Sequence, residues 1–166
     1  METHTFEFNY QIFEAKELPE YASLLYQESV KALSLSWSPY STFQVGAAIL
    51  LENGEVLRGA NQENAAYPMC LCAERVVLAT AASQFPRVSI KSMCVLARLG
   101  EQESLHPVSP CGACRQVLLE TENKQNASIS LYLGGTEEKL LHLANSSLLL
   151  PLAFGGLEAN LFPNQK

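Results

Sequence analysis

The chain has 166 residues, of which 48% are hydrophobic and 17% are charged, and its 17 acidic and 11 basic residues give a net charge of -6. This length and composition predict one globular domain over residues 1–166 with a hydrophobic core of its own. The acidic balance and the lack of a long lysine or arginine run argue against binding to a nucleic-acid polymer, because such binding requires neutralised phosphates.

The lack of a recognisable targeting signal and the cysteine content of the chain indicate a reducing compartment. Residues 1–8 fit neither a secretory signal nor a transit peptide, and no apolar run approaches membrane-spanning length, so we expect no membrane association and a cytoplasmic protein. Five cysteines are an odd number. Without an export signal they favour metal binding or isolated buried thiols over a disulfide framework.

The first predicted elements are a helix and a β-hairpin. Apolar residues recur at helical spacing over residues 17–36, and Pro19 is tolerable in the first turn of such a helix. A strand over residues 42–51 and a second strand over residues 55–60 flank an Asn-Gly pair, which is a strong hairpin signal. These two strands should therefore pair antiparallel.

Helices and strands alternate in the second half of the chain. The predicted segments are a helix over 72–83, a buried strand over 89–98, a helix over 111–123, a strand over 127–133 and a weaker strand over 139–143. A polar loop over 100–109 precedes the second of these helices. The apolar segment 148–156 needs burial, which a second subunit could provide.

This order of elements predicts an α/β fold with three layers, α/β/α, around a mixed sheet of about five strands. Two helices act as crossovers between strands that should run parallel. Sites in such sheets favour the carboxyl ends of strands, where the following helices begin. Two cysteine-containing segments, residues 68–75 and 110–115, occupy such helix starts.

Three cysteines at these helix starts have the composition of a zinc site. Two residues separate Cys111 from Cys114, so both sulfurs can face one centre from a first helical turn, and Cys72 would approach from the other helix start. Helix starts stabilise thiolates. Three protein ligands leave the fourth tetrahedral position of a catalytic zinc to water. Arg75 and Arg115 are candidates to offset the resulting negative charge.

Glu74 is the candidate catalytic residue, because it lies two residues after Cys72 and can reach the open position of the metal. It would act as the general base that takes a proton from water and as the acid that returns it to the leaving group. Partial burial raises a carboxyl pKa toward that of zinc-activated water, about 7, so this transfer is not steeply uphill. A simple interaction with the helix dipole is the alternative role.

Other interpretations of the thiols remain open at this stage. Cys70 could add a fourth thiolate and make the site a closed, structural one, although its spacing to Cys72 is tighter than the usual two-residue knuckle. A redox role for the Cys-x-x-Cys pair would leave Cys72 and Glu74 without a task. Cys94, in the middle of a predicted strand, fits a core position.

A Cys-x-Glu segment followed by Pro-Cys-x-x-Cys is the signature of zinc deaminases. Five segments, residues 38–48, 61–65, 72–75, 110–116 and 149–155, resemble the cytidine deaminase family of small homotetrameric nucleoside deaminases, in the same order. The resemblance implies that family's fold and one zinc ion per subunit. It further implies a hydrolase of pyrimidine salvage that converts cytidine and 2'-deoxycytidine to uridine and 2'-deoxyuridine and releases ammonia.

The same resemblance implies substrate-binding roles. Phe43 would line the base pocket, and Asn61 and Glu63 would bind the ribose hydroxyls, for which an amide and a carboxylate are suited. Ala73 and Cys111 would offer backbone groups to the pyrimidine.

Subunit sharing is also implied by the resemblance. Phe154 would stack on the base from a neighbouring subunit, and Tyr67 would lie near the subunit contact, in a homotetramer with shared active sites. Cys70 departs from the small residue that many relatives have there. Two alternatives remain: a deaminase of a modified nucleoside of the blasticidin type, against which Asn61 and Glu63 argue, and a structural zinc-binding interaction module.

Overall fold

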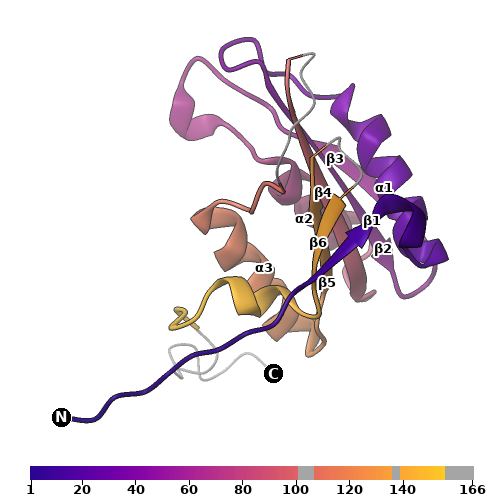
Figure 1. Ribbon diagram of the computed structural model, residues 1–166. Coiled ribbons are helices and arrows are strands. Elements are labelled where there is room, and N and C mark those ends of the chain that lie inside the picture. Colours follow the sequence, from indigo (N-terminus) through magenta and orange to yellow (C-terminus); the bar gives the residue numbers. More distant parts are fainter. Residues whose placement is uncertain (101–106, 136–138, 156–166) are drawn as a thin grey trace.

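The computed structural model describes residues 1–100, 107–135 and 139–155 (Figure 1). Its helices and strands are β1 (Gln11–Glu14), α1 (Glu20–Leu33), β2 (Phe43–Leu51), β3 (Val56–Ala60), α2 (Ala73–Gln84), β4 (Ile90–Leu99), α3 (Gly112–Gln125), β5 (Ser130–Gly134) and β6 (Lys139–Leu143). Residues 101–106 of the predicted loop and Gly156 of the predicted apolar segment lie outside the described residues.

The described strands form one mixed sheet in the order β1-β6-β5-β4-β2-β3. Strands β4 and β5 pair parallel, and the other neighbours pair antiparallel. Because β3 and β4 both run antiparallel to β2, they share a direction, so α2 and α3 each connect strands of the same direction. These are the predicted crossovers, and the α/β fold class is confirmed.

The sheet has six described strands instead of about five. The additional strand is β1, which lies at the edge beside β6, and no element was predicted before residue 17. The other predicted strands are found with ends shifted by up to three residues. Strand β5 begins at Ser130 instead of 127, since Asn126 ends α3 in the left-handed region with φ 51°.

Helix α1 covers one face of the sheet, and α2 and α3 cover the other (Figure 1). The alternation of side chains along β2 divides the core accordingly, because Ala48 packs in the cluster under α1 while Ala47 and Ile49 pack in the cluster under α2 and α3. In the part of the chain that the structure describes, no helix has the length and apolar character needed to span a membrane.

Candidate active site

The candidate metal-binding thiols lie at the starts of two helices on the same face of the sheet. Cys72 is the N-cap residue of α2, Cys111 is the N-cap residue of α3, and Cys114 lies in the first turn of α3. Gly59 in β3 allows α2 to approach closely, since a Cβ there would lie 2.9 Å from the Ala73 carbonyl oxygen and 2.8 Å from a backbone nitrogen one turn later. The predicted helix starts therefore converge.

The spacing of the three sulfurs fits a zinc ion. The Sγ atoms of Cys72 and Cys111 are 3.8 Å apart, those of Cys111 and Cys114 are 3.5 Å apart, and all three lie within 4.8 Å of one another. A tetrahedral centre with Zn–S bonds of about 2.3 Å places its sulfurs roughly 3.8 Å apart. The cluster is thus compatible with one zinc ion per chain.

The electrostatics of the cluster favour a thiolate at its centre. A hydrogen bond from Cys114 lowers the pKa of Cys72 to about 6, against the opposing effect of burial, and Arg75 makes a smaller contribution in the same direction. The same hydrogen bond raises the pKa of Cys114, as does burial. A divalent cation would replace this shared proton and hold the sulfurs as thiolates.

Glu74, in the first turn of α2, is buried with 4% of its surface exposed. Burial raises the pKa of its carboxyl, while hydrogen bonds from its own backbone N–H and from the Cys114 thiol act in the opposite direction. Its side chain therefore reaches the sulfur cluster while being shielded from water. A carboxyl with a raised pKa in this position is suited to exchange protons at neutral pH.

A cleft of about 370 Å³ opens beside the cluster and brings together residues from three predicted sets. Its lining includes the metal candidates Cys72 and Cys111, the catalytic candidate Glu74 and the substrate-binding candidates Phe43, Asn61 and Glu63. Cys70, Leu71, Val95, Ala97 and Val108 complete much of its wall, and four of these five side chains are apolar. Such a cleft, apolar with a few convergent polar groups, suits a small heterocyclic ligand.

Asn61 follows β3 and is 9% exposed. Its Oδ1 accepts hydrogen bonds from the Ser36 hydroxyl at 2.6 Å and the Val45 N–H at 2.8 Å, and its Nδ2 donates to the Phe43 carbonyl at 2.8 Å. One Nδ2 hydrogen remains for a ligand, because an amide nitrogen carries two. This side chain therefore holds the cleft wall together as well as facing the cleft.

Glu63 is held by the segment that precedes β2. Its carboxylate accepts hydrogen bonds from the Tyr40 N–H at 2.9 Å, the Ser41 N–H at 3.3 Å and the Ser41 hydroxyl at 2.5 Å. The Ser41 hydroxyl, with further help from the backbone, lowers the pKa of Glu63. The side chain is thus a fixed, ionised acceptor at the edge of the cleft.

Two residues near the cluster make contacts outside it. The Cys70 sulfur accepts a hydrogen bond from the Asn64 N–H at 3.2 Å and is not a member of the three-sulfur group. Arg115 donates through Nε to the Pro110 carbonyl at 2.8 Å and through Nη1 to the Leu149 carbonyl at 3.0 Å. It joins the segment before α3 to the segment after β6.

The remaining predicted residues are placed around the cleft or away from it. Ala73 is fully buried between Cys72 and Glu74. Phe154 is 67% exposed and does not line the cleft of its own chain, and its carbonyl accepts a hydrogen bond from Gln116. Tyr67 is 69% exposed, with its ring edge against Tyr40.

Sequence reasoning missed the residues that brace the site. Ser36 positions Asn61, and Tyr40 and Ser41 position Glu63 through a hydroxyl and two backbone N–H groups. The serines and aromatic residues before β2 did give a signal, because they belong to a segment that resembles the deaminase family. That resemblance did not predict the hydrogen bonds that they make. Backbone donors have no sequence signal of their own.

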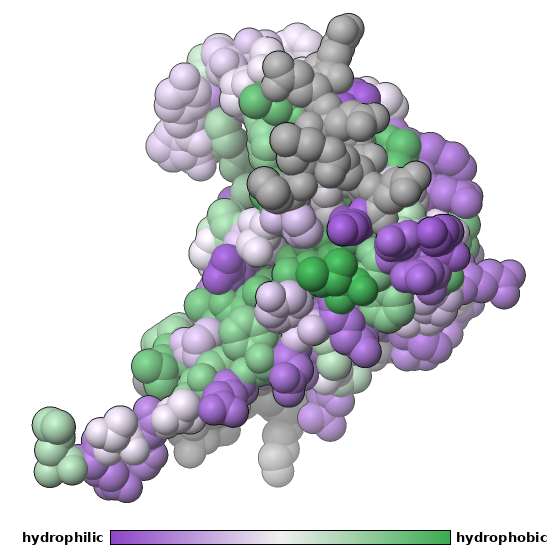
Figure 2. Space-filling view, in the orientation of Figure 1, coloured by the Kyte–Doolittle hydropathy of each residue, from purple (hydrophilic) through white to green (hydrophobic). Residues whose placement is uncertain are grey.

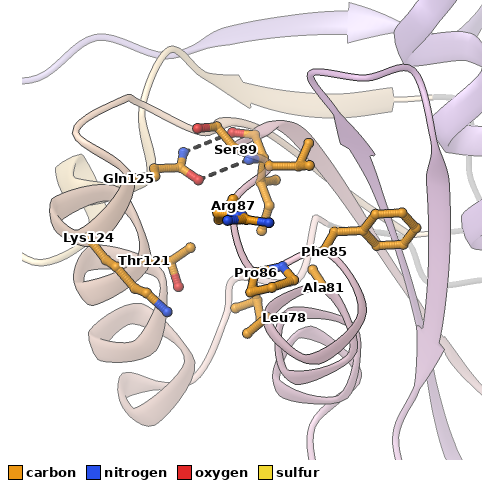
Figure 3. A pocket seen from close by; sticks show the side chains of 12 residues that line it. Leu78, Ala81, Phe85, Pro86, Arg87, Ser89, Thr121, Lys124 and Gln125 are labelled. Carbon is orange, nitrogen blue, oxygen red and sulfur yellow. Dashed lines mark hydrogen bonds between the residues drawn. The ribbon is translucent and has the colours of Figure 1, made fainter.

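A second cavity, of about 390 Å³, lies between the far ends of α2 and α3 (Figure 3). The Gln125 side chain closes one side by bonding both the N–H and the carbonyl of Ile90 at 2.9 Å. Arg87 and Lys124 contribute to its lining, which contains neither cysteine nor carboxylate. The thiol cluster and Glu74 therefore identify the first cleft, not this one, as the candidate active site.

Known proteins that resemble this chain match it over the residues that form the candidate site. The family described as "Cytidine and deoxycytidylate deaminase zinc-binding region" matches residues 19–128, which include all three clustered cysteines and Glu74. A cytidine deaminase of Halalkalibacterium halodurans is 40% identical over 82% of this chain and 96% of the relative. A cytidine deaminase of Sporosarcina psychrophila is 43% identical over 78% and 88%.

Solved structures resemble the described fold. The crystal structure of cytidine deaminase from Burkholderia pseudomallei matches with a TM-score of 0.70 at 32% identity, covering 82% of this chain and 100% of the other. That of cytidine deaminase from Mycobacterium tuberculosis matches with a TM-score of 0.62 at 30% identity, covering 81% and 97%. The similarity therefore extends over nearly the whole length of these relatives.

Proposed function

Because this chain belongs to the cytidine and deoxycytidylate deaminase family, we propose that it deaminates cytidine and 2'-deoxycytidine by hydrolysis of the C4–N bond. The products are uridine and 2'-deoxyuridine, with release of ammonia. The observation that carries the proposal is the cleft in which a three-thiol cluster and a buried carboxyl meet Asn61 and Glu63. The reaction class is that of a zinc hydrolase in pyrimidine salvage.

Cys72, Cys111 and Cys114 would hold the zinc ion. The ion would supply a Lewis acid that makes water a nucleophile at neutral pH. Three thiolates carry one negative charge more than the ion neutralises. Arg75 lies close enough to favour the Cys72 thiolate, and Arg115 stands beside Cys114 in sequence, so both are proposed to offset this charge.

Glu74 moves the protons in this proposal. Its carboxylate takes a proton from the attacking water and delivers it to N3 of the pyrimidine, which makes C4 electrophilic. The carboxylate then takes the second proton, from the hydroxyl now bound to C4, and passes it to the amino group as the C4 carbonyl forms, the C4–N bond breaks and ammonia leaves. Burial of Glu74 supports both roles, because a raised pKa allows the carboxyl to alternate between its two forms near neutral pH.

The rim of the cleft would select a free nucleoside. Glu63 offers carboxylate oxygens to ribose hydroxyls, and Asn61 retains one N–H for a hydroxyl or a ring oxygen. Phe43 would pack on the pyrimidine, with backbone groups of Ala73 and Cys111 at its polar edge. A nucleoside whose sugar is replaced or substituted would leave these polar groups unpaired.

We further propose a cytoplasmic homotetramer in which subunits share active sites. The exposure of Phe154 and of Leu152, at 67% and 105%, supports a covering subunit, because large apolar side chains this exposed suit an interface. Phe154 would then stack on a base bound in a neighbour's cleft. Tyr67, exposed beside the cleft, would lie near that contact.

The test is ammonia release from cytidine by zinc-loaded protein, with a Glu74→Gln variant beside it. The variant should bind zinc normally and lose about 10³-fold or more in kcat, within the range that general acid–base catalysis supplies. A Glu74→Gln variant with a near-normal rate would contradict the mechanism. If the zinc-loaded parent chain releases no ammonia from either nucleoside, a structural zinc module becomes the better explanation.

A further inference from the structure

The segment before α1 carries an alternating pattern that the proposed function does not use. Phe6, Phe8, Tyr10 and Ile12 stand at every second position, separated by the polar residues Glu7, Asn9 and Gln11. A period of two places such residues on one face of an extended strand. The segment also lies outside residues 19–128, the part matched by the deaminase family.

The structure extends this segment as an arm, defined here as residues 4–14, that leaves the sheet beside β6 (Figure 1). Phe6, Phe8, Tyr10 and Ile12 are 55%, 45%, 54% and 61% exposed. The rings of Phe6 and Phe8 are 6.2 Å apart, and those of Phe8 and Tyr10 are 6.4 Å apart, so they form a row. Figure 2 shows apolar surface running along the arm where it leaves the body.

The arm is also a sheet edge. Strand β1 pairs with β6 from Glu14 to Gln11, where Gln11 faces His142, and its other side meets no strand among the described residues. An extended edge with one apolar face is a template for pairing with another chain. Because the pairing with β6 ends at Gln11, residues 6–10 pair on neither side with any strand that the structure describes.

We propose that the arm pairs antiparallel with the arm of a second copy of this chain, about a two-fold axis through Asn9. This register places Phe8 of one copy opposite Tyr10 of the other, and Phe6 opposite Ile12, so each residue of the exposed apolar row meets another residue of that row. Phe13, on the other face of the strand, packs in the core under α1 and lies opposite Thr5. Glu7 faces Gln11. Apolar cross-strand pairs contribute about 0.2–1 kcal/mol each, and a two-fold axis forms every pair twice.

The positions of the charged residues favour the same register. With the axis at Asn9, His4 falls opposite Glu14 and no like charges face each other. An axis at Phe8 would set Glu2 against Glu14 and bury His4 against Ile12. Any axis between two residues would set the apolar row against polar residues, because it pairs even positions with odd ones.

An axis further along the arm, at Tyr10, is unfavourable because it places carboxylates against aromatic residues. With the axis at Tyr10, Phe6 would face Glu14 and Glu7 would face Phe13, so both carboxylates would lose polar surroundings. Of the axes through Phe8, Asn9 and Tyr10, only the one at Asn9 therefore satisfies the apolar row and the charges together. A second copy fits the arm because the arm's own sequence is its complement, and this proposal does not rest on the deaminase function.

The test uses engineered thiols in the zinc-loaded full-length protein. Two Asn9 Cα atoms opposite each other would lie about 4.5–5.5 Å apart, within disulfide range, so mild oxidation of Asn9→Cys should crosslink most of the protein into dimers. Thr5→Cys is the matched control. Its counterpart on the other copy would be eight residues out of register, roughly 27 Å away, and should crosslink no more than the parent chain.

Equal crosslinking of the two variants would overturn the proposal, because it would indicate random collision of arms. Failure of Asn9→Cys to crosslink above the parent background would also overturn it. Adding Phe8→Asp to the Asn9→Cys variant should reduce crosslinking at least fivefold by placing a charge against Tyr10. Circular dichroism and zinc content should stay unchanged in that double variant, since Phe8 is about half exposed and packs in no core cluster.

Discussion

In two regions of this molecule, the pKa values of cysteine side chains shift in opposite directions. At the starts of α2 and α3, hydrogen bonding from Cys114 lowers the pKa of Cys72 to about 6. In the middle of β4, burial raises the pKa of Cys94 to about 12, against a hydrogen bond involving Ser29. The same side chain is thus prepared to bind a metal in one place and kept a neutral thiol in the other.

The second region is a row across the sheet under α1. Cys94, Tyr132 and His142 are register neighbours on β4, β5 and β6. Burial raises the pKa of Tyr132 and lowers that of His142, so each of the three shifts favours the neutral form. The comparison teaches that position in the fold decides thiol chemistry. Helix starts offer donors and an opening to solvent, whereas at the sheet centre complete burial outweighs the one hydrogen bond from Ser29.

The largest effect expected is on metal binding. Cys114→Ser should lower zinc content from about one per chain to less than a tenth and reduce cytidine deamination at least 10³-fold, because a hydroxyl is a poor zinc ligand and two thiolates do not complete the set. Metal analysis after dialysis and the ammonia assay measure both.

Cys94→Ala is the matched control for that variant. It should keep its zinc and its rate within about twofold and lose about 1 kcal/mol of unfolding free energy, since only a small buried group is removed. The contrast between the two regions would fail if Cys94→Ala lost zinc, or if Cys114→Ser retained it.

Much of this contrast could be predicted from the sequence. Helix starts and thiol spacing are local properties, so the convergence of Cys72, Cys111 and Cys114 followed once the strand order was known. Cys94 was placed in the core by the apolar run around it. The contacts of Arg115 with two carbonyls could not be predicted, because backbone acceptors from Pro110 and Leu149 meet only in the folded chain.

The arm and the bracing of the cleft were missed for related reasons. The alternation from Phe6 to Ile12 is a strand signal, yet a strand with one neighbour has too little burial to be recognised by apolar content alone. Asn61 was assigned to substrate. Within the chain, its Oδ1 already accepts hydrogen bonds from Ser36 and Val45, and one Nδ2 hydrogen is already donated to the Phe43 carbonyl. These partners lie 16 to 25 residues away in the sequence, so the contacts could not be predicted.

An intermediate effect is expected at the cleft rim, where Asn61 is buried and Glu63 is partly exposed. Asn61→Ala should raise KM for cytidine about tenfold and also lower the free energy of unfolding by about 1–3 kcal/mol, because the Val45 N–H loses its acceptor in a partly buried position. Steady-state kinetics and urea unfolding give the two numbers.

A Glu63→Ala variant separates substrate binding from the structural role of the cleft rim. Its carboxylate is more exposed and accepts from groups that solvent can reach, so KM should rise at least tenfold while unfolding changes by less than about 1 kcal/mol. If both variants lost stability equally and bound cytidine normally, the rim residues would be structural and the ribose assignment would be wrong.

The smallest effect tests the neutral row at its exposed end. The His142 ring stacks on Tyr132 at 4.5 Å, meets the edge of Phe13 at 5.7 Å and hydrogen-bonds Ser130 and Gln11. Burial lowers its pKa in the folded state, and none of these contacts is a carboxylate that would stabilise an imidazolium.

Because the folded pKa of His142 lies below the unfolded one, the unfolded chain binds more protons between those two values. Stability should therefore be unaffected by His142 above about pH 7 and should fall as pH drops through the unfolded pKa, about 6.5, toward the folded pKa. In His142→Gln, the loss of unfolding free energy from pH 7.5 to pH 5.5 should be smaller than in the parent chain, although the variant is less stable at pH 7.5. Comparing the two pH differences cancels metal release and the other histidines, which both proteins share. Identical pH differences would mean that the row does not suppress charge at His142, and the contrast with the thiol cluster would then rest on Cys94 and Tyr132 alone.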